Sequence, residues 1–143
     1  MSQSSDLIRS ARRTILLELE AVEGLLSHIG ADFVCACEMI LASKGRVVVV
    51  GMGKSGHAGK KIAATLASTG TTAFFVHPAE ASHGDMGMIT KEDIILVLSN
   101  SGTTDEIVTL LPIIKRLGIK MISVTGNPES TLSKAAEVNL NVH

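Results

Sequence analysis

Apolar residues in the first third of the chain recur at helical spacing. Between residues 7 and 29 they fall every three or four positions, with Ser4 or Ser5 as the N-cap and Gly30 as the stop. A second segment with the same period runs from Phe33 to Ala42 and ends at Gly45. We therefore predict two N-terminal helices within residues 4–44. The first is more apolar than one face of a domain requires, which predicts a homo-oligomer.

From residue 46 onward, short β-branched runs alternate with helical patterns. The run Arg46–Val50 has no polar alternation, which is typical of a strand buried in a parallel sheet. The alternation indicates βαβ units with right-handed crossovers. We predict an α/β fold, a three-layer α/β/α sandwich with a five-stranded parallel sheet of the doubly wound, flavodoxin-like kind, over residues 46–143. The expected strands after the first are Ala73–Val76, Ile94–Leu98, Ile119–Val124 and Val138–Val142. We expect one helix that ends near Ser68, one from about Thr104 to Leu117, and a short one near Thr131–Ala136. The second strand is followed by a loop rich in His and Gly.

Composition narrows the class of protein. A length of 143 residues with 45% hydrophobic content fits one globular domain over residues 1–143. The net charge is -1 and the only aromatic residues are three Phe, so we expect no nucleic-acid partner. The longest apolar runs are strand-sized and no signal peptide pattern is visible, so we expect no membrane association and a cytoplasmic location. Cys35 and Cys37 are expected to be buried core thiols.

The segment Gly51–His57, which follows the first strand, is a candidate phosphate loop. As a GxGxxG dinucleotide motif it would need an Asp or Glu about 20 residues further on, where the chain has Val76, His77 and Pro78. As a Walker loop it would need a glycine five residues before Gly53, where Val48 stands. Two interpretations remain: a loop that holds a single sugar phosphate, and a purely structural glycine turn.

A second candidate loop, Ser99–Thr104, follows the strand Ile94–Leu98. Its hydroxyls at positions 99, 101, 103 and 104, together with free backbone N–H groups at the start of a helix, would form a neutral cradle for an anion. Helix capping alone could explain one such loop. Two of them at the carboxyl ends of strands in one sheet favour a ligand that carries a phosphate.

Three segments in this order resemble a known family: GMGKSGHAGKKIAATLASTGT, FFVHPAEASHGDMGMI and SNSGTTDEI. They are similar to the sugar isomerase (SIS) domain, and within it to the D-arabinose 5-phosphate isomerase family. The resemblance implies an aldose–ketose isomerase that interconverts D-ribulose 5-phosphate and D-arabinose 5-phosphate through an enediol, at the start of Kdo synthesis for lipopolysaccharide. It also implies a small sugar phosphate as the partner, assembly into dimers or tetramers, and no cofactor.

The resemblance also assigns roles to single residues. Lys54 would stabilise the enediolate or bind sugar hydroxyls, and Glu106 would be the catalytic base. His83 would take part in acid–base steps, and His57 could share them or bind substrate. With His77 these histidines could bind zinc, but no thiolate or tight ligand pair accompanies them, so we expect hydrogen bonding and no metal. The phosphate and substrate contacts would come from Gly53, Ser55, Ser99, Ser101 and Thr104.

In one respect the sequence departs from this family. Members continue past the fifth strand with another acidic active-site residue, helices that carry a further histidine and usually a pair of CBS modules, whereas this sequence stops at His143. We therefore expect the 143-residue chain to be weakly active or inactive. Two alternatives stay open: a non-catalytic module that senses a sugar phosphate, and an isomerase of a related hexulose or heptulose phosphate.

Overall fold

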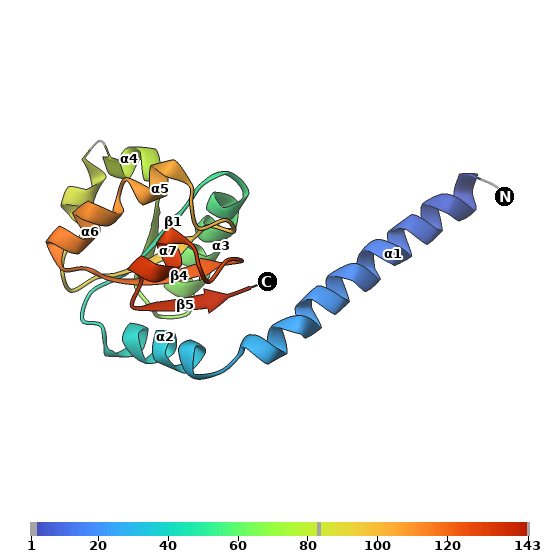
Figure 1. The fold of residues 1–143 in the computed structure, drawn as a ribbon, viewed down its shortest axis with the longest axis horizontal. Helices are drawn as coiled ribbons and strands as arrows, with labels where there is room; N and C mark the ends of the chain where they lie inside the picture. The colour runs from blue at the N-terminus through green and yellow to red at the C-terminus, as the bar shows by residue number, and fades with distance from the viewer. Residues whose placement is uncertain (1–2, 83, 143) are drawn as a thin grey trace.

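A five-stranded parallel sheet forms the centre of the molecule (Figure 1). The computed structural model describes residues 3–82 and 84–142. All four strand pairs are parallel, and the strand order is β2-β1-β3-β4-β5. The predicted α/β fold is therefore confirmed. The strands are β1 (Val47–Gly51), β2 (Ala73–Val76), β3 (Ile94–Leu98), β4 (Lys120–Thr125) and β5 (Val138–Asn141).

Alternate residues of the strands build two separate cores, one on each face of the sheet. Val48 and Val50 of β1 belong to one core, and Val47 and Val49 belong to the other. This is the arrangement expected of strands that are apolar throughout. The first core is covered by α4 (Pro78–Ser82), the 3-10 helix η2 (Asp85–Met88), α5 (Asp105–Val108), α6 (Leu111–Leu117) and α7 (Thr131–Ala135), and the second by α2 (Ala31–Ala42) and α3 (Gly53–Ser68).

Two predicted segments differ from the structure. The helix expected over Thr104–Leu117 is divided into α5 and α6, because Pro112 has no N–H to donate to the carbonyl of Val108 and its ring collides with that carbonyl in a regular helix. The segment after β2, expected to be a loop, contains the short helices α4 and η2. The other strands and helices lie within a few residues of their predicted bounds.

Helix α1 (Gln3–Gly24) projects away from the rest of the molecule (Figure 1). It is followed by a 3-10 turn, η1 (Leu25–His28), so the regular helix ends earlier than the predicted stop at Gly30. Its large apolar side chains are each more than half exposed. Within the described part of the chain, no single helix is long and apolar enough to cross a bilayer. Residues 4–28 and α2, which meet at a sharp bend, together have the length and composition of a membrane span, and nothing beyond length and composition supports that interpretation.

The two cysteines are not the buried core thiols that the sequence suggested. Cys35 is exposed and Cys37 is partly buried, and both are free thiols. Ala36, which lies between them, is the buried residue of α2. The face of α2 that packs on the sheet therefore passes between the two cysteines.

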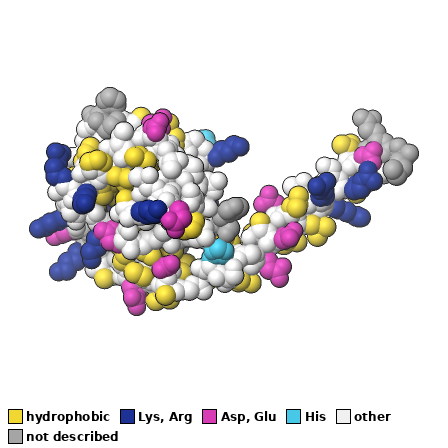
Figure 2. All heavy atoms as spheres, viewed as in Figure 1, with side chains coloured by type: hydrophobic (Ala, Val, Ile, Leu, Met, Phe, Trp, Pro, Cys, Tyr) yellow, Lys and Arg dark blue, Asp and Glu magenta, His cyan; other side chains and the backbone are white. Residues whose placement is uncertain are grey.

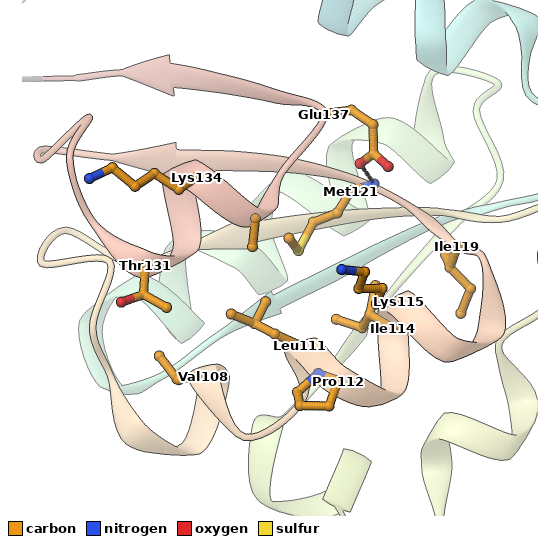
Figure 3. Close-up of a pocket in the computed structure, with 11 residues that line it drawn as sticks. Val108, Leu111, Pro112, Ile114, Lys115, Ile119, Met121, Thr131, Lys134 and Glu137 are labelled. Atoms are coloured by element: carbon orange, nitrogen blue, oxygen red, sulfur yellow. Dashed lines mark hydrogen bonds between the residues drawn. The ribbon is translucent and has the colours of Figure 1, made fainter.

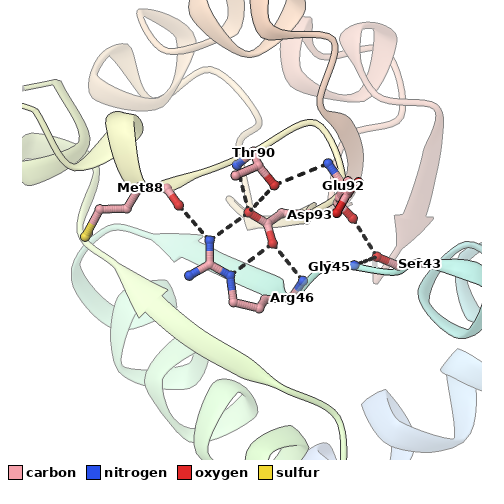
Figure 4. Close-up of polar contacts among 7 residues, drawn as sticks. All are labelled: Ser43, Gly45, Arg46, Met88, Thr90, Glu92 and Asp93. Atoms are coloured by element: carbon pink, nitrogen blue, oxygen red, sulfur yellow. Dashed lines mark hydrogen bonds and ion pairs between the residues drawn. The ribbon is translucent and has the colours of Figure 1, made fainter.

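An ion pair fastens β1 to β3 at the amino-terminal end of the sheet (Figure 4). Asp93 is only 2% exposed. Its carboxylate accepts hydrogen bonds from the backbone N–H of Arg46 (2.7 Å), from the Arg46 guanidinium (2.9 and 3.1 Å) and from the backbone N–H of Thr90 (2.8 Å). Burial by itself would raise the pKa of Asp93, but these donors outweigh it and hold the pKa well below its usual range.

We expect Asp93→Asn to lower the free energy of unfolding by about 2 kcal/mol at neutral pH, because a buried carboxylate is lost while the side chain of Arg46, which is 36% exposed, stays partly solvated. Since the folded-state pKa of Asp93 is lowered, the stabilisation is complete above the pKa of the unfolded carboxyl, about 3.9, and is lost as the pH falls through the folded-state value. Denaturant unfolding between pH 3 and pH 7 should therefore show the two proteins converging in acid. Asp6→Asn, at an exposed pair with Arg9, is the control and should change little. A constant gap across this pH range would contradict the assignment.

Candidate functional site

The two candidate loops leave neighbouring strands at the same level. Gly51, the last residue of β1, pairs in register with Leu98, the last residue of β3. The helices that follow lie on opposite faces, since α3 packs in the core of Val49 and α5 packs in the core of Val48. In a parallel sheet of order 2-1-3-4-5, this is the switch point where ligands bind in the crevice outside the carboxyl ends of the strands.

A close approach of backbone to backbone fixes the start of α3. A Cβ on Gly51 would lie 2.9 Å from the carbonyl group of Ser55, and a Cβ on Gly56 would lie 2.8 Å from the carbonyl oxygen of Gly51. Both distances are shorter than real Cβ atoms allow. The glycines of this loop therefore serve packing at the strand end, and they also bring the first turn of a 16-residue helix directly above β1.

The predicted ligand residues of this loop lie on that first turn. Gly53 begins α3 with a φ of 54°, Lys54 and His57 are exposed, and Ser55 is partly buried. The first-turn N–H groups of a helix have no intrahelical acceptors, and the helix dipole favours an anion in front of them. The first turn of α3 thus offers backbone donors, a hydroxyl and an ammonium group at the β1 end of the crevice.

The loop after β3 is organised by its own hydroxyls. Ser99 is 4% exposed, and its Oγ accepts a hydrogen bond from the backbone N–H of Gly102 (3.1 Å) and lies 3.0 Å from the Oγ1 of Thr104. Ser101 is exposed, and its Oγ accepts from the N–H of Thr103 (3.3 Å). Ser99 and Thr104 therefore hold the shape of the loop, whereas Ser101 presents its hydroxyl outward.

Helix α7 and the end of β4 brace this loop from behind. The carbonyl of Gly102 accepts a hydrogen bond from the N–H of Leu132 (3.0 Å), and the carbonyl of Asn100 accepts from the N–H of Gly126 (2.9 Å). Gly102 has a φ of 65°, and a Cβ on it would lie 2.0 Å from the Oγ of Ser130. Our sequence prediction missed Ser130, although a serine directly before a helical segment is a recognisable N-cap signal.

Glu106 lies on a very short helix. It is exposed on the first turn of α5, which has only four residues before the chain turns into α6. A helix this short has a small dipole, and Thr104, its N-cap, bonds to Ser99 instead of capping it. On this side of the crevice, an anion would therefore be bound mainly by the hydrogen-bond donors of the loop and less by the dipole of α5. Helix α4 packs against α5, so the segment after β2 borders the same region.

The histidines are placed at different strand ends. His57 is on α3, and His77, after β2, accepts a hydrogen bond at its Nδ1 from the N–H of Ala79 (3.3 Å). His83 lies outside the described residues. Within residues 3–82 and 84–142, no group of three or more His, Cys, Asp or Glu side chains is arranged to hold a metal ion.

The SIS domain family model matches residues 40–143. This chain belongs to the SIS domain family. It is 77% identical over 141 residues to the arabinose 5-phosphate isomerase KdsD of Pseudomonas aeruginosa, covering 99% of this chain and 43% of that protein. It is 55% identical over 139 residues to KdsD of Francisella tularensis, covering 95% of this chain and 42% of that protein. The chain thus spans less than half the length of these curated relatives.

A solved structure also matches this SIS domain closely. The structure of Escherichia coli CFT073 c3406 in complex with arabinose 5-phosphate has a TM-score of 0.93 and 39% sequence identity. The match covers 99% of this chain and 75% of that chain. The likeness therefore extends through all the elements described above, including α1.

A groove on this SIS domain lies away from the switch point, and Figure 3 shows the residues that line it. It is a groove of about 620 Å³ between α6 and α7, beside the amino-terminal half of β4. Apolar side chains such as Leu111 and Met121 line it, with Lys115, Lys134 and Glu137 among its polar groups. None of the predicted site residues lines this groove, and the crevice at the carboxyl ends of β1 and β3 remains the candidate site.

We expect Gly102→Ala to damage the loop after β3 selectively. The new methyl group would occupy the position of the Ser130 hydroxyl at a φ that disfavours alanine, a strain of about 1–3 kcal/mol. Calorimetric titration with a sugar phosphate should show a Kd that is higher by about 10-fold or more. Gly24→Ala is the matched control, because its φ is -55° and its Cβ would meet nothing within 4 Å. Unchanged affinity in Gly102→Ala would mean that this loop does not contact the ligand.

Proposed function

We propose that this chain is the sugar-phosphate-binding and isomerase domain of an arabinose 5-phosphate isomerase, which interconverts D-ribulose 5-phosphate and D-arabinose 5-phosphate. The observation that carries the proposal is 77% identity along 99% of the chain to a protein of that name. Because the chain spans 43% of that relative, the activity of the whole protein is part of the proposal. So are its place in the supply of Kdo for lipopolysaccharide, a cytoplasmic location, a homo-oligomeric state and the assignment of residues 1–143 to one SIS domain.

The crevice at the switch point suits a small phosphorylated sugar. On the β3 side, Ser101 and the backbone of residues 99–104 supply neutral donors, which Ser99 and Thr104 hold in place. On the β1 side, Ser55 and the first turn of α3 face the same edge of the sheet. We assign the phosphate to the loop after β3, with Ser55 as a further donor. Gripping a phosphate remote from the reacting carbons would position C1 and C2 for proton transfer.

The proposed reaction moves one proton between adjacent carbons. A base removes a proton from C1 of the ketose, the carbonyl at C2 becomes an enediolate, and a proton returns to C2 on the face that gives the arabinose configuration. We propose that Glu106 is the base and that Lys54 stabilises the enediolate oxygen; both are exposed on first turns at adjacent strand ends. His83 and His57 are assigned to transfer of the hydroxyl protons and to substrate binding.

Phosphate recognition is tested by comparing two sugars. We expect D-ribulose 5-phosphate to raise the Tm of the protein and unphosphorylated ribulose at the same concentration to leave it unchanged, since only a ligand that binds the folded state stabilises it. Inorganic phosphate alone serves as the control for the anion. Equal shifts with both sugars would contradict the phosphate site. If the native full-length protein bound the phosphorylated sugar without converting it, the protein would be a sensor instead of an enzyme.

Lys54→Ala should lower kcat by about 100-fold in the longest native form of the protein, because removal of one partner of a developing oxyanion costs this much. Rates of arabinose 5-phosphate formation from ribulose 5-phosphate measure the effect. Lys61→Ala, an exposed lysine further along α3, is the matched control and should keep the wild-type rate. A rise in KM with kcat intact would make Lys54 a substrate-binding residue only.

A further inference from the structure

We propose that Ser130 is a positioning residue for the phosphate group: at the start of α7 it fixes the peptide between Gly102 and Thr103, so that the N–H of Thr103 faces the ligand. Ser130 lies outside the loop after β3 and is only 3% exposed, so it acts through the loop and not on the ligand itself. The inference rests on the proposed function, since it requires that this loop binds the phosphate.

The backbone of Gly102 lies directly against the start of α7. A Cβ on Gly102 would lie 2.0 Å from the Oγ of Ser130 and 2.4 Å from its Cβ, so the serine side chain fills the space beside this glycine. The carbonyl of Gly102 accepts a hydrogen bond from the N–H of Leu132 (3.0 Å), a fully buried residue. The N-cap and the first turn of α7 therefore hold one peptide of the loop in place.

This contact decides which way the next N–H points. The peptides of the loop are trans, and in a trans peptide the C=O and N–H bonds point in opposite directions. Since the carbonyl of Gly102 points at α7, the N–H of Thr103 points away from it, toward the exposed hydroxyl of Ser101 (3.3 Å). The N–H of Gly102 is bound within the loop by Ser99 (3.1 Å). The N–H of Thr103 and the Ser101 hydroxyl are thus donors that the loop turns outward.

A chain of buried hydroxyls holds Ser130 in position. Its Oγ accepts a hydrogen bond from the N–H of Ser133 (3.2 Å) and lies 2.8 Å from the Oγ of Ser133. The Ser133 hydroxyl donates to the carbonyl of Asn127 (2.8 Å), so the proton between the two serines belongs to Ser130. Thr125 of β4 places its Oγ1 2.9 Å from the Oγ of Ser133 and 3.0 Å from the Oδ1 of Asn139 on β5. Hydrogen bonds thus tie Ser130 to the last two strands of the sheet.

Substitution in the native full-length protein tests the positioning role. We expect Ser130→Ala to raise the Kd for inorganic phosphate and the KM for ribulose 5-phosphate by about 5-fold each, because loss of the N-cap frees the first turn of α7 and the peptide that it holds. The kcat should stay within about 2-fold of wild type, since Ser130 touches no reacting atom.

Ala135→Gly is the matched control for helix stability. Ala135 is exposed at the other end of α7, where glycine destabilises the helix without touching the hydroxyl chain. We expect this variant to lower the Tm and to leave both Kd and KM unchanged. Exposed Lys and Arg side chains lie at several places on the face shown in Figure 2, so the titrations use about 0.15 M salt to screen non-specific attraction of phosphate.

Hydrogen exchange in the wild-type protein tests the same contact without any substitution. If opening of the contact between Leu132 and Gly102 abolishes phosphate binding, bound phosphate must suppress that opening. We expect exchange of the Leu132 amide to slow by about 10-fold at a phosphate concentration of about ten times the Kd. The amide of Gly118, bonded to the carbonyl of Lys115 at the end of α6 (3.1 Å), is the control and should not change.

The outcomes separate this inference from the proposed function. Wild-type phosphate affinity in Ser130→Ala, an equal loss of affinity in Ala135→Gly, or unchanged exchange of the Leu132 amide would each overturn the positioning role and leave the phosphate site itself standing. Failure of the wild-type protein to bind either inorganic phosphate or ribulose 5-phosphate would instead overturn the proposed function, and the positioning role with it.

Discussion

The pairing of β1 with β3 is the constraint on which the proposed site depends. Arg46 and Asp93 join the two strands at their amino-terminal ends, and from there the register runs without a bulge to Gly51 and Leu98. A slip of one residue would turn the side chains of the shifted strand to the opposite face of the sheet and would also move one loop out of level with the other. The ion pair lies at the opposite end of the strands from the crevice. It thus helps to position the loops without occupying the space that a ligand needs.

The two loops obtain their shape in different ways. The loop after β1 is shaped by absence of side chains, because Gly51 and Gly56 let the first turn of α3 rest on the strand end. The loop after β3 is shaped by hydrogen bonds, with Ser99 inside it and the Ser130 segment behind it. Among the described residues, every buried side-chain nitrogen or oxygen atom has a hydrogen-bond partner. A ligand would therefore meet a preformed surface, which reduces the ordering cost of binding.

Much of this arrangement could be predicted from the sequence. The strand Ala73–Val76 has the predicted bounds, and the loop positions followed from the ends of apolar runs. The division at Pro112 is a local effect that the sequence contains, since proline interrupts a regular helix. The role of Ser130 could not be predicted, because it depends on the distance of Ser130 to Gly102 in space. Burial of Cys35 was predicted wrongly, because helical period defines a face but does not say which neighbour covers it. The roles of Lys54, Glu106 and His83 came from resemblance alone and stay predictions.

Because α1 projects from the domain, the stability of its helical structure depends on what packs against it. The 22 residues of α1 form a helix whose large apolar side chains stay more than half exposed within the chain itself, while ordering each residue costs on the order of 1 kcal/mol or more. Packing against another molecule would offset that cost, so folding of the helix and association become one equilibrium. By mass action, the helical content of residues 3–24 would then rise with protein concentration.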